Sequence, residues 1–158
     1  VREYAHLLRD DGNYVERAKR ITALLRDPVE LVAPRIAQLA LRPHAPEQRR
    51  VVFHPPCSQL HGLKVAGSVE TVLTALGAEV LPVPGTAMCC GSAGTYSLLQ
   101  PAIAASLRDA RIALLTTAAP QAILSANVGC ISHLAAGTAL PVRHWVEWVD
   151  ERLATSTV

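Results

Sequence analysis

The chain has 158 residues, of which 50% are hydrophobic, 18% charged and 4% aromatic, and its formal net charge is +2. The apolar fraction excludes a disordered chain, and nine glycines with four cysteines exclude collagen-like and disulfide-rich mini-proteins. So small a charge also gives no reason to expect nucleic acid as a partner. A chain of this length makes one globular unit that needs no metal or disulfide merely to fold, so the four cysteines need another explanation.

The sequence contains no run of 18 apolar residues, so we expect no transmembrane segment. It begins at Val1, without an initiator methionine or the basic-then-apolar layout of a signal peptide. We therefore expect part of a longer protein in the cytoplasm, where cysteine clusters bind metal or carry out redox chemistry more often than they form disulfides.

Helical spacing of apolar residues governs the first 42 residues, with Asp27-Pro28 ending one helix and beginning the next. The proline-bearing connector 42–46 follows this segment. The sequence therefore predicts a helical N-terminal segment over 1–45 and a separate domain over 46–158.

From residue 50 onward the pattern alternates between strand and helix. Strands are predicted over 50–54, 79–83, 122–126 and 140–143, and helices over 65–76, 103–115 and 144–153. Gly77 is expected to end the first of these helices, and the second is expected to turn a face rich in Arg and Asp outward. Trp145 and Trp148 are expected in the core or in an interface rather than as electron relays. This alternation predicts an α/β fold, a Rossmann-like open parallel sheet of about four strands with helices on both faces, preceded by the helical segment.

The cysteines follow the predicted strands. Cys57 comes after the first strand, Cys89 and Cys90 after the second, and Cys130 after the third. We expect all four in loops beyond the carboxyl edge of the sheet, where open α/β sheets bind ligands, and four thiolates there could hold an iron–sulfur cluster or a zinc ion. Any single cysteine could instead be a small buried hydrophobe, whereas a disulfide fits neither the compartment nor the adjacent pair.

Other residues near the cysteines fit a site as well. Gly91 and Gly94 suit a loop whose backbone approaches a bound group closely, although an ordinary helix start capped by Ser92 or Thr95 would look the same. His133 lies three residues after Cys130 and could be a ligand, a hydrogen-bond donor to a sulfur, or a surface residue. His54 and His61 flank Cys57 and could support it.

These motifs resemble a known family. The segments His54–Cys57, Cys89–Tyr96 and Ala126–Cys130 with His133 are similar to the cysteine-rich CCG domain found in heterodisulfide reductases and in glycolate oxidase iron–sulfur subunits. The resemblance implies a second CCG repeat, preceded in its full-length chain by ferredoxin-type modules and a first repeat. It implies metal ligation of a [4Fe–4S] cluster by Cys57, Cys89, Cys90 and Cys130, with Gly91, Gly94 and His133 at the cofactor.

The resemblance further implies electron transfer in a glycolate (2-hydroxy-acid) dehydrogenase complex, from FAD on a flavoprotein subunit toward quinone. Such partners could hold the protein at the inner face of the membrane. The family pattern has a fifth cysteine where this chain has His133, which argues against a non-cubane cluster. Two alternatives remain: a structural zinc-binding or metal-free interaction domain, and thiol–disulfide chemistry at Cys89-Cys90.

Overall fold

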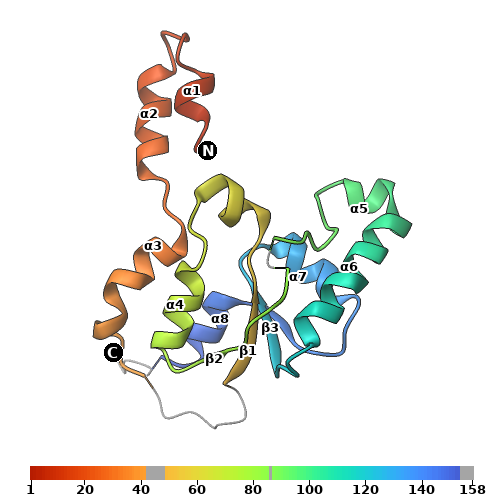
Figure 1. Ribbon diagram of the computed structural model, residues 1–158. Coiled ribbons are helices and arrows are strands. Elements are labelled where there is room, and N and C mark those ends of the chain that lie inside the picture. The colour runs from red at the N-terminus through yellow and green to blue at the C-terminus, as the bar shows by residue number, and fades with distance from the viewer. Residues whose placement is uncertain (42–48, 86, 154–158) are drawn as a thin grey trace.

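The computed structural model describes residues 1–41, 49–85 and 87–153. Its centre is a four-stranded, all-parallel sheet in the order β2-β1-β3-β4 (Figure 1). The strands are β1 (Arg50–His54), β2 (Glu79–Val80), β3 (Ala122–Ser125) and β4 (Val142–His144). The predicted α/β fold with a parallel sheet is confirmed.

The strand order contains a topological switch point between β1 and β3. From β1 the chain moves outward to β2, then crosses back to β3 and continues outward to β4 on the other side. The connections that leave β1 and β3 therefore diverge, and the crevice between them is where open α/β sheets bind ligands. His54 and Ser125 are paired at this end of the two strands, and the Ser125 hydroxyl donates a hydrogen bond to the His54 carbonyl at 2.8 Å.

Within the described ranges, five α-helices lie after the first strand. They are α4 (Ser68–Ala75), α5 (Tyr96–Leu99), α6 (Pro101–Thr116), α7 (Val128–Ala135) and α8 (Trp145–Asp150), and a single π-helical turn, η3 (Ser58–Leu63), lies between β1 and α4. Helices α4 and α8 cover one face of the sheet, and α6 and α7 cover the other (Figure 1). Both faces are thus buried, as a parallel sheet requires.

Alternation along the strands sorts side chains between two cores. Val51 and Phe53 of β1 face the α4/α8 side, where both tryptophans are buried as expected. Val52 faces the α6/α7 side together with Ile123 of β3. Because side chains on a strand alternate between its faces, His54 follows Val52 and points to the α6/α7 side, where Cys90 and Cys130 are buried.

The N-terminal segment consists of short helices, as predicted. They are α1 (Tyr4–Leu7), α2 (Val15–Leu24), α3 (Pro28–Val32) and the 3₁₀ turn η1 (Ala33–Gln38). Asp27 and Glu30 form a reciprocal capping box at the start of α3, which satisfies free amides there. Helices α1 and α2 project from the rest of the molecule, whereas Val29 of α3 is part of the α4/α8 core (Figure 1). The expected connector 42–46 and the boundary at 45/46 lie outside the described residues.

Three predictions about individual elements are wrong in detail. Strand β2 ends at Val80 rather than residue 83, because Pro82 has no amide to continue the ladder. The helix predicted over 65–76 is shorter, since the π-helical turn and a left-handed Lys64 precede it, although Gly77 does follow it with φ +89°. Cys130 lies in the first turn of α7 rather than in a loop, because Asn127 caps that helix three residues earlier.

The predicted outward face of α6 is wrong for Arg111. Its side chain is fully buried, in line with Ala104 and Leu115 on the inner stripe of the helix. Arg108 of the same helix pairs with the exposed Asp109 at 2.8 Å, although the Arg108 side chain is only 20% exposed and lies against Gly137. In the part of the chain that the structure describes, no helix is long and apolar enough to cross a membrane.

Candidate metal centre

All four cysteines line one cavity at the carboxyl edge of the sheet, with a volume of about 250 Å³. Its remaining walls come from the segments that follow β1, β2 and β3: Pro56, Ser58, Ser92, Ala93, Gly94 and Asn127. The four are free thiols, and their exposure falls from Cys57, which is exposed, through Cys89 to the buried Cys90 and Cys130. The cavity therefore has a solvent-facing mouth at Cys57 and a buried floor.

Two groups of sulfurs can be distinguished in the cavity. At the floor, the Cys90 and Cys130 sulfurs and a ring nitrogen of His54 all lie within 4.8 Å of one another. At the mouth, the thiols of Cys57 and Cys89 interact with each other. Spacings of this kind suit soft thiolate ligands of zinc or of an iron–sulfur cluster.

Local sequence places each thiol. Pro55-Pro56 ends β1, and the Pro56 carbonyl accepts the first amide bonds of the π-helical turn that begins after Cys57. π-Helical turns are uncommon and occur frequently at functional sites. On the other side of the crevice, the Asn127 side chain accepts hydrogen bonds from the Gly129 and Cys130 amides at 2.9 and 3.2 Å.

The two candidate glycines occupy different environments. Gly91 has φ +86°, and a Cβ there would lie 2.5 Å from the Ala104 carbonyl oxygen, so only glycine fits against α6. Its amide donates to the Cys89 sulfur at 3.3 Å. Gly94 lines the cavity with φ +60°, but nothing lies within 4 Å of the position of its missing Cβ. Gly91 thus packs the loop between β2 and α5, called the cysteine loop below, against α6. Gly94 faces the open cavity.

His133 lies on α7, where its Nε2 is 3.1 Å from the Ala104 carbonyl oxygen. It is also 3.2 Å from where a Gly91 Cβ would be, and it is not among the residues that line the cavity. His133 of α7 therefore lies against α6 and the Cys90-Gly91 turn, outside the cavity that the thiols line.

The pKa values of the two buried thiols shift in opposite directions. A hydrogen bond from the Cys130 thiol lowers the pKa of Cys90 to about 4, helped by His54 and the Ser92 amide and opposed by burial. The same hydrogen bond and burial raise the pKa of Cys130 far above its usual range. Burial and the neighbouring Cys89 raise the pKa of Cys57. Several thiolates in one cavity thus repel one another unless a cation joins them, which is the condition of a metal-binding thiol set.

Sequence reasoning missed Arg111, which lies behind the floor of the cavity. Its Nε donates to His54 Nδ1 at 3.1 Å, and one terminal nitrogen donates to the Gly85 carbonyl at 2.7 Å, at the start of the cysteine loop. Burial lowers the pKa of Arg111, and the nearby Cys90 opposes that shift. The signal was present in the sequence, since Ala104, Arg111 and Leu115 are spaced as one helical stripe.

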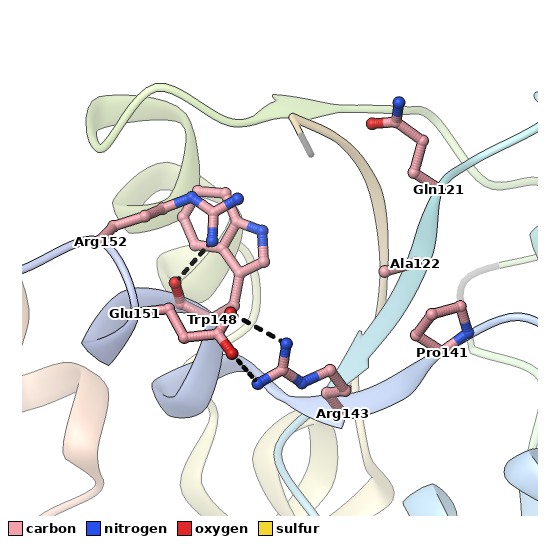
Figure 2. A pocket seen from close by; sticks show the side chains of 7 residues that line it. All are labelled: Gln121, Ala122, Pro141, Arg143, Trp148, Glu151 and Arg152. Carbon is pink, nitrogen blue, oxygen red and sulfur yellow. Dashed lines mark hydrogen bonds and ion pairs between the residues drawn. The ribbon is translucent and has the colours of Figure 1, made fainter. Parts of the chain in front are cut away.

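A larger cavity, of about 330 Å³, lies at the opposite, amino edge of the sheet (Figure 2). Its charged groups are compensated, because Arg143 makes two hydrogen bonds to the Glu151 carboxylate at 2.9 and 2.6 Å. Arg152 stacks over the Trp148 ring at 3.4 Å and donates to the Trp148 carbonyl. The thiols, and not the larger cavity, therefore mark the candidate centre.

Comparison with known proteins agrees with this geometry. The CCG cysteine-rich domain matches residues 51–135, which include most of β1, all of β3 and all four cysteines. The chain belongs to the CCG cysteine-rich domain family. The resemblance inferred from the motifs is thereby confirmed.

Three relatives are informative. The chain is 40% identical to the glycolate oxidase iron-sulfur subunit of Escherichia coli K12, over 97% of this chain and 37% of that protein. It is 28% identical to a probable glycolate oxidase iron-sulfur subunit of Bacillus subtilis, over 85% of this chain and 30% of that protein. It is 24% identical to lactate utilization protein A of Anoxybacillus flavithermus, over 96% and 65%. The chain thus spans between about a third and two thirds of these relatives.

Proposed function

We propose that Cys57, Cys89, Cys90 and Cys130 hold a [4Fe–4S] cluster in a module that relays electrons. The observation that carries this proposal is the convergence of four free thiols on one cavity at the switch point of a CCG domain. Such a cluster accepts and releases one electron at a time. The likeness to two iron-sulfur subunits supports iron over other metals.

The residues around the thiols have separate tasks in this proposal. The Gly91 amide, 3.3 Å from the Cys89 sulfur, stabilises negative charge on that ligand, and Gly94 leaves room at the cavity wall. His133 contacts the Ala104 carbonyl and lies beside Gly91, and it thereby positions the Cys90-Gly91 turn. The exposed Cys57 marks the side on which electrons enter or leave.

We further propose that this module works in a 2-hydroxy-acid dehydrogenase complex. Glycolate would lose two electrons and two protons to FAD on a flavoprotein subunit, giving glyoxylate, and the electrons would pass singly through clusters toward quinone. Ferredoxin-type modules and a first CCG repeat would belong to the same longer polypeptide, in the cytoplasm. Within the present chain, residues 1–45 would be a linker and 46–158 the CCG domain. The names of the relatives, which refer to glycolate and to lactate, support a 2-hydroxy acid as the substrate of the complex.

The test is anaerobic reconstitution with iron and sulfide, followed by analysis of iron, sulfide and zinc and by visible and electron paramagnetic resonance spectra. We expect about four iron and four sulfide per chain for the parent, as a [4Fe–4S] cluster requires. Cys57→Ser, Cys89→Ser, Cys90→Ser and Cys130→Ser should each lose most of this iron. Ser58→Ala removes a polar group from the same cavity wall and is the matched control, which should load fully.

Three results would contradict the proposal. One zinc and no iron would favour a structural zinc site, for which the compact group of His54, Cys90 and Cys130 offers ligands. Neither metal would favour an interaction domain. A reversible two-electron couple between Cys89 and a second thiol, in a chain without iron, would favour thiol–disulfide chemistry.

A further inference from the structure

Arg111 carries a positive charge into the interior without a carboxylate partner among the described residues. Its side chain has no exposed surface, and its hydrogen-bond acceptors are the His54 ring and the Gly85 and Pro84 carbonyls. One terminal nitrogen, Nη2, is buried and has no acceptor in the described part of the chain. Burying a charge without a counter-charge is strongly unfavourable, so its retention calls for a negative group nearby.

The contact with His54 determines where the imidazole carries its proton. A guanidinium has only donors, so Nδ1 of His54, which receives the Arg111 bond, must be the acceptor. The ring proton of a neutral imidazole then resides on Nε2. Because Nδ1 is occupied, Nε2 is the nitrogen free to donate to the sulfurs, and a ring nitrogen lies within 4.8 Å of both Cys90 and Cys130.

The three residues Arg111, His54 and Cys90, called the relay below, come from three different elements. Arg111 comes from α6, His54 from the last position of β1, and Cys90 from the loop after β2. The His54 side chain is buried, and its ring is held by the Arg111 hydrogen bond to Nδ1. The arrangement connects a fixed positive charge to a ligand sulfur through one imidazole.

We propose that Arg111 and His54 are positioning residues that raise the reduction potential of the cluster by directing positive charge and an N–H donor at Cys90. This inference rests on the proposed function. Reduction adds one negative charge, and a hydrogen bond to a ligand sulfur together with a buried cation stabilises the reduced form more than the oxidised form.

The first experiment is nitrogen NMR of the His54 ring in the folded parent chain. We expect the signature of the Nε2–H form, and Arg111→Met should replace it with a mixture of the two tautomers. Arg108→Met is the matched control, because Arg108 lies on the same helix but pairs with Asp109 and not with His54. A parent His54 protonated at Nδ1 would overturn the proposal, and that measurement needs no variant to fold.

The second experiment measures the midpoint potential of the reconstituted chain. We expect Arg111→Met to decrease the equilibrium constant for one-electron reduction by at least tenfold, a shift of about 59 mV to more negative potential. Arg111→Lys, which keeps the charge, should recover most of this loss, and Arg108→Met should match the parent. Equal potentials for Arg111→Met and the parent, or equal losses for Arg111→Met and Arg111→Lys, would overturn the role of the charge.

The two experiments separate this inference from the function on which it rests. If the parent takes up no iron, the proposed function fails, whatever the tautomer of His54. If the parent loads and Arg111→Met leaves both tautomer and potential unchanged, the relay fails and the iron–sulfur assignment stands.

Discussion

The two edges of the sheet each border a cavity, and the two cavities differ in their chemistry. At the amino edge, the larger cavity is bordered by Arg143 bound to Glu151 and by Arg152 stacked on Trp148. At the carboxyl edge, the smaller cavity is bordered by four free thiols with a buried arginine behind them. The volume of a cavity thus says less about its role than whether its polar groups already satisfy one another.

We expect the amino edge of the sheet to contribute to stability and the carboxyl edge to bind the ligand. Substitutions at the amino edge should change the free energy of unfolding without changing the iron content of the folded chain. Substitutions in the cysteine loop should change both, or iron content alone.

The largest effect on stability is expected for Trp148→Ala. The indole is 3% exposed and stacks under Arg152, so its removal should lower the free energy of unfolding by about 3–5 kcal/mol. Urea unfolding of the metal-free chain measures this loss, and Trp148→Phe, which keeps a ring, should lose less. Iron per folded chain should remain at the parent value. A loss of iron from the folded fraction would remove the distinction between the two edges.

A smaller effect, specific to the cysteine loop, is expected for Gly91→Ala. Positive φ and the clash with the Ala104 carbonyl should together cost about 2–4 kcal/mol, and the displaced turn should reduce iron uptake. Gly94→Ala is the matched control for unfolding, since its φ is also positive but its Cβ position is open, and it should cost about 1–2 kcal/mol. Iron analysis and urea unfolding report the two quantities. Equal losses of unfolding free energy for both variants would show that close packing beneath Cys90 does not matter.

The smallest effect is expected for Arg143→Gln at the amino edge. The hydrogen bonds from Arg143 hold the pKa of the Glu151 carboxyl below its usual range, so this pair stabilises the fold above the unfolded pKa of about 4.3. Its contribution is lost as the pH falls through the lower, folded pKa. Because both side chains are partly exposed, the loss near neutral pH should be only about 0.3–0.8 kcal/mol.

Unfolding midpoints near pH 7 and below about pH 3 test the Arg143→Gln prediction, since the difference from the parent should shrink in acid. Arg50→Gln offers a control, as its longer, 3.6 Å contact with Glu79 is more exposed. A difference from the parent that grows as the pH falls would contradict this account of the pair.

Much of the architecture followed from local patterns in the chain. Short continuous apolar runs in 50–54 and 122–126 predicted the central strands, because a parallel strand is buried on both faces. Helical spacing in 103–115 predicted α6. Asp27-Pro28 marked a helix start through capping, which is a local interaction. The second strand was predicted too long, because Pro82, which has no amide for the ladder, was counted within it.

The candidate centre was predictable in one part and not in another. Placing each cysteine after a strand was sufficient to bring Cys57, Cys89, Cys90 and Cys130 to one edge, since parallel strands all end there. The burial of each thiol and the position of His133 beside Gly91 could not be predicted, because they depend on how α6 and α7 pack on the sheet.

The sequence by itself determined the α/β class, the CCG motif and the edge of the sheet at which the thiols gather. Only the tertiary structure decided that Arg111, 57 residues away from His54 along the chain, hydrogen-bonds to it behind Cys90. An arginine in an amphipathic helix is read as exposed, because burying its charge is costly. That cost is offset by partners on distant segments, which the chain supplies only once it has folded.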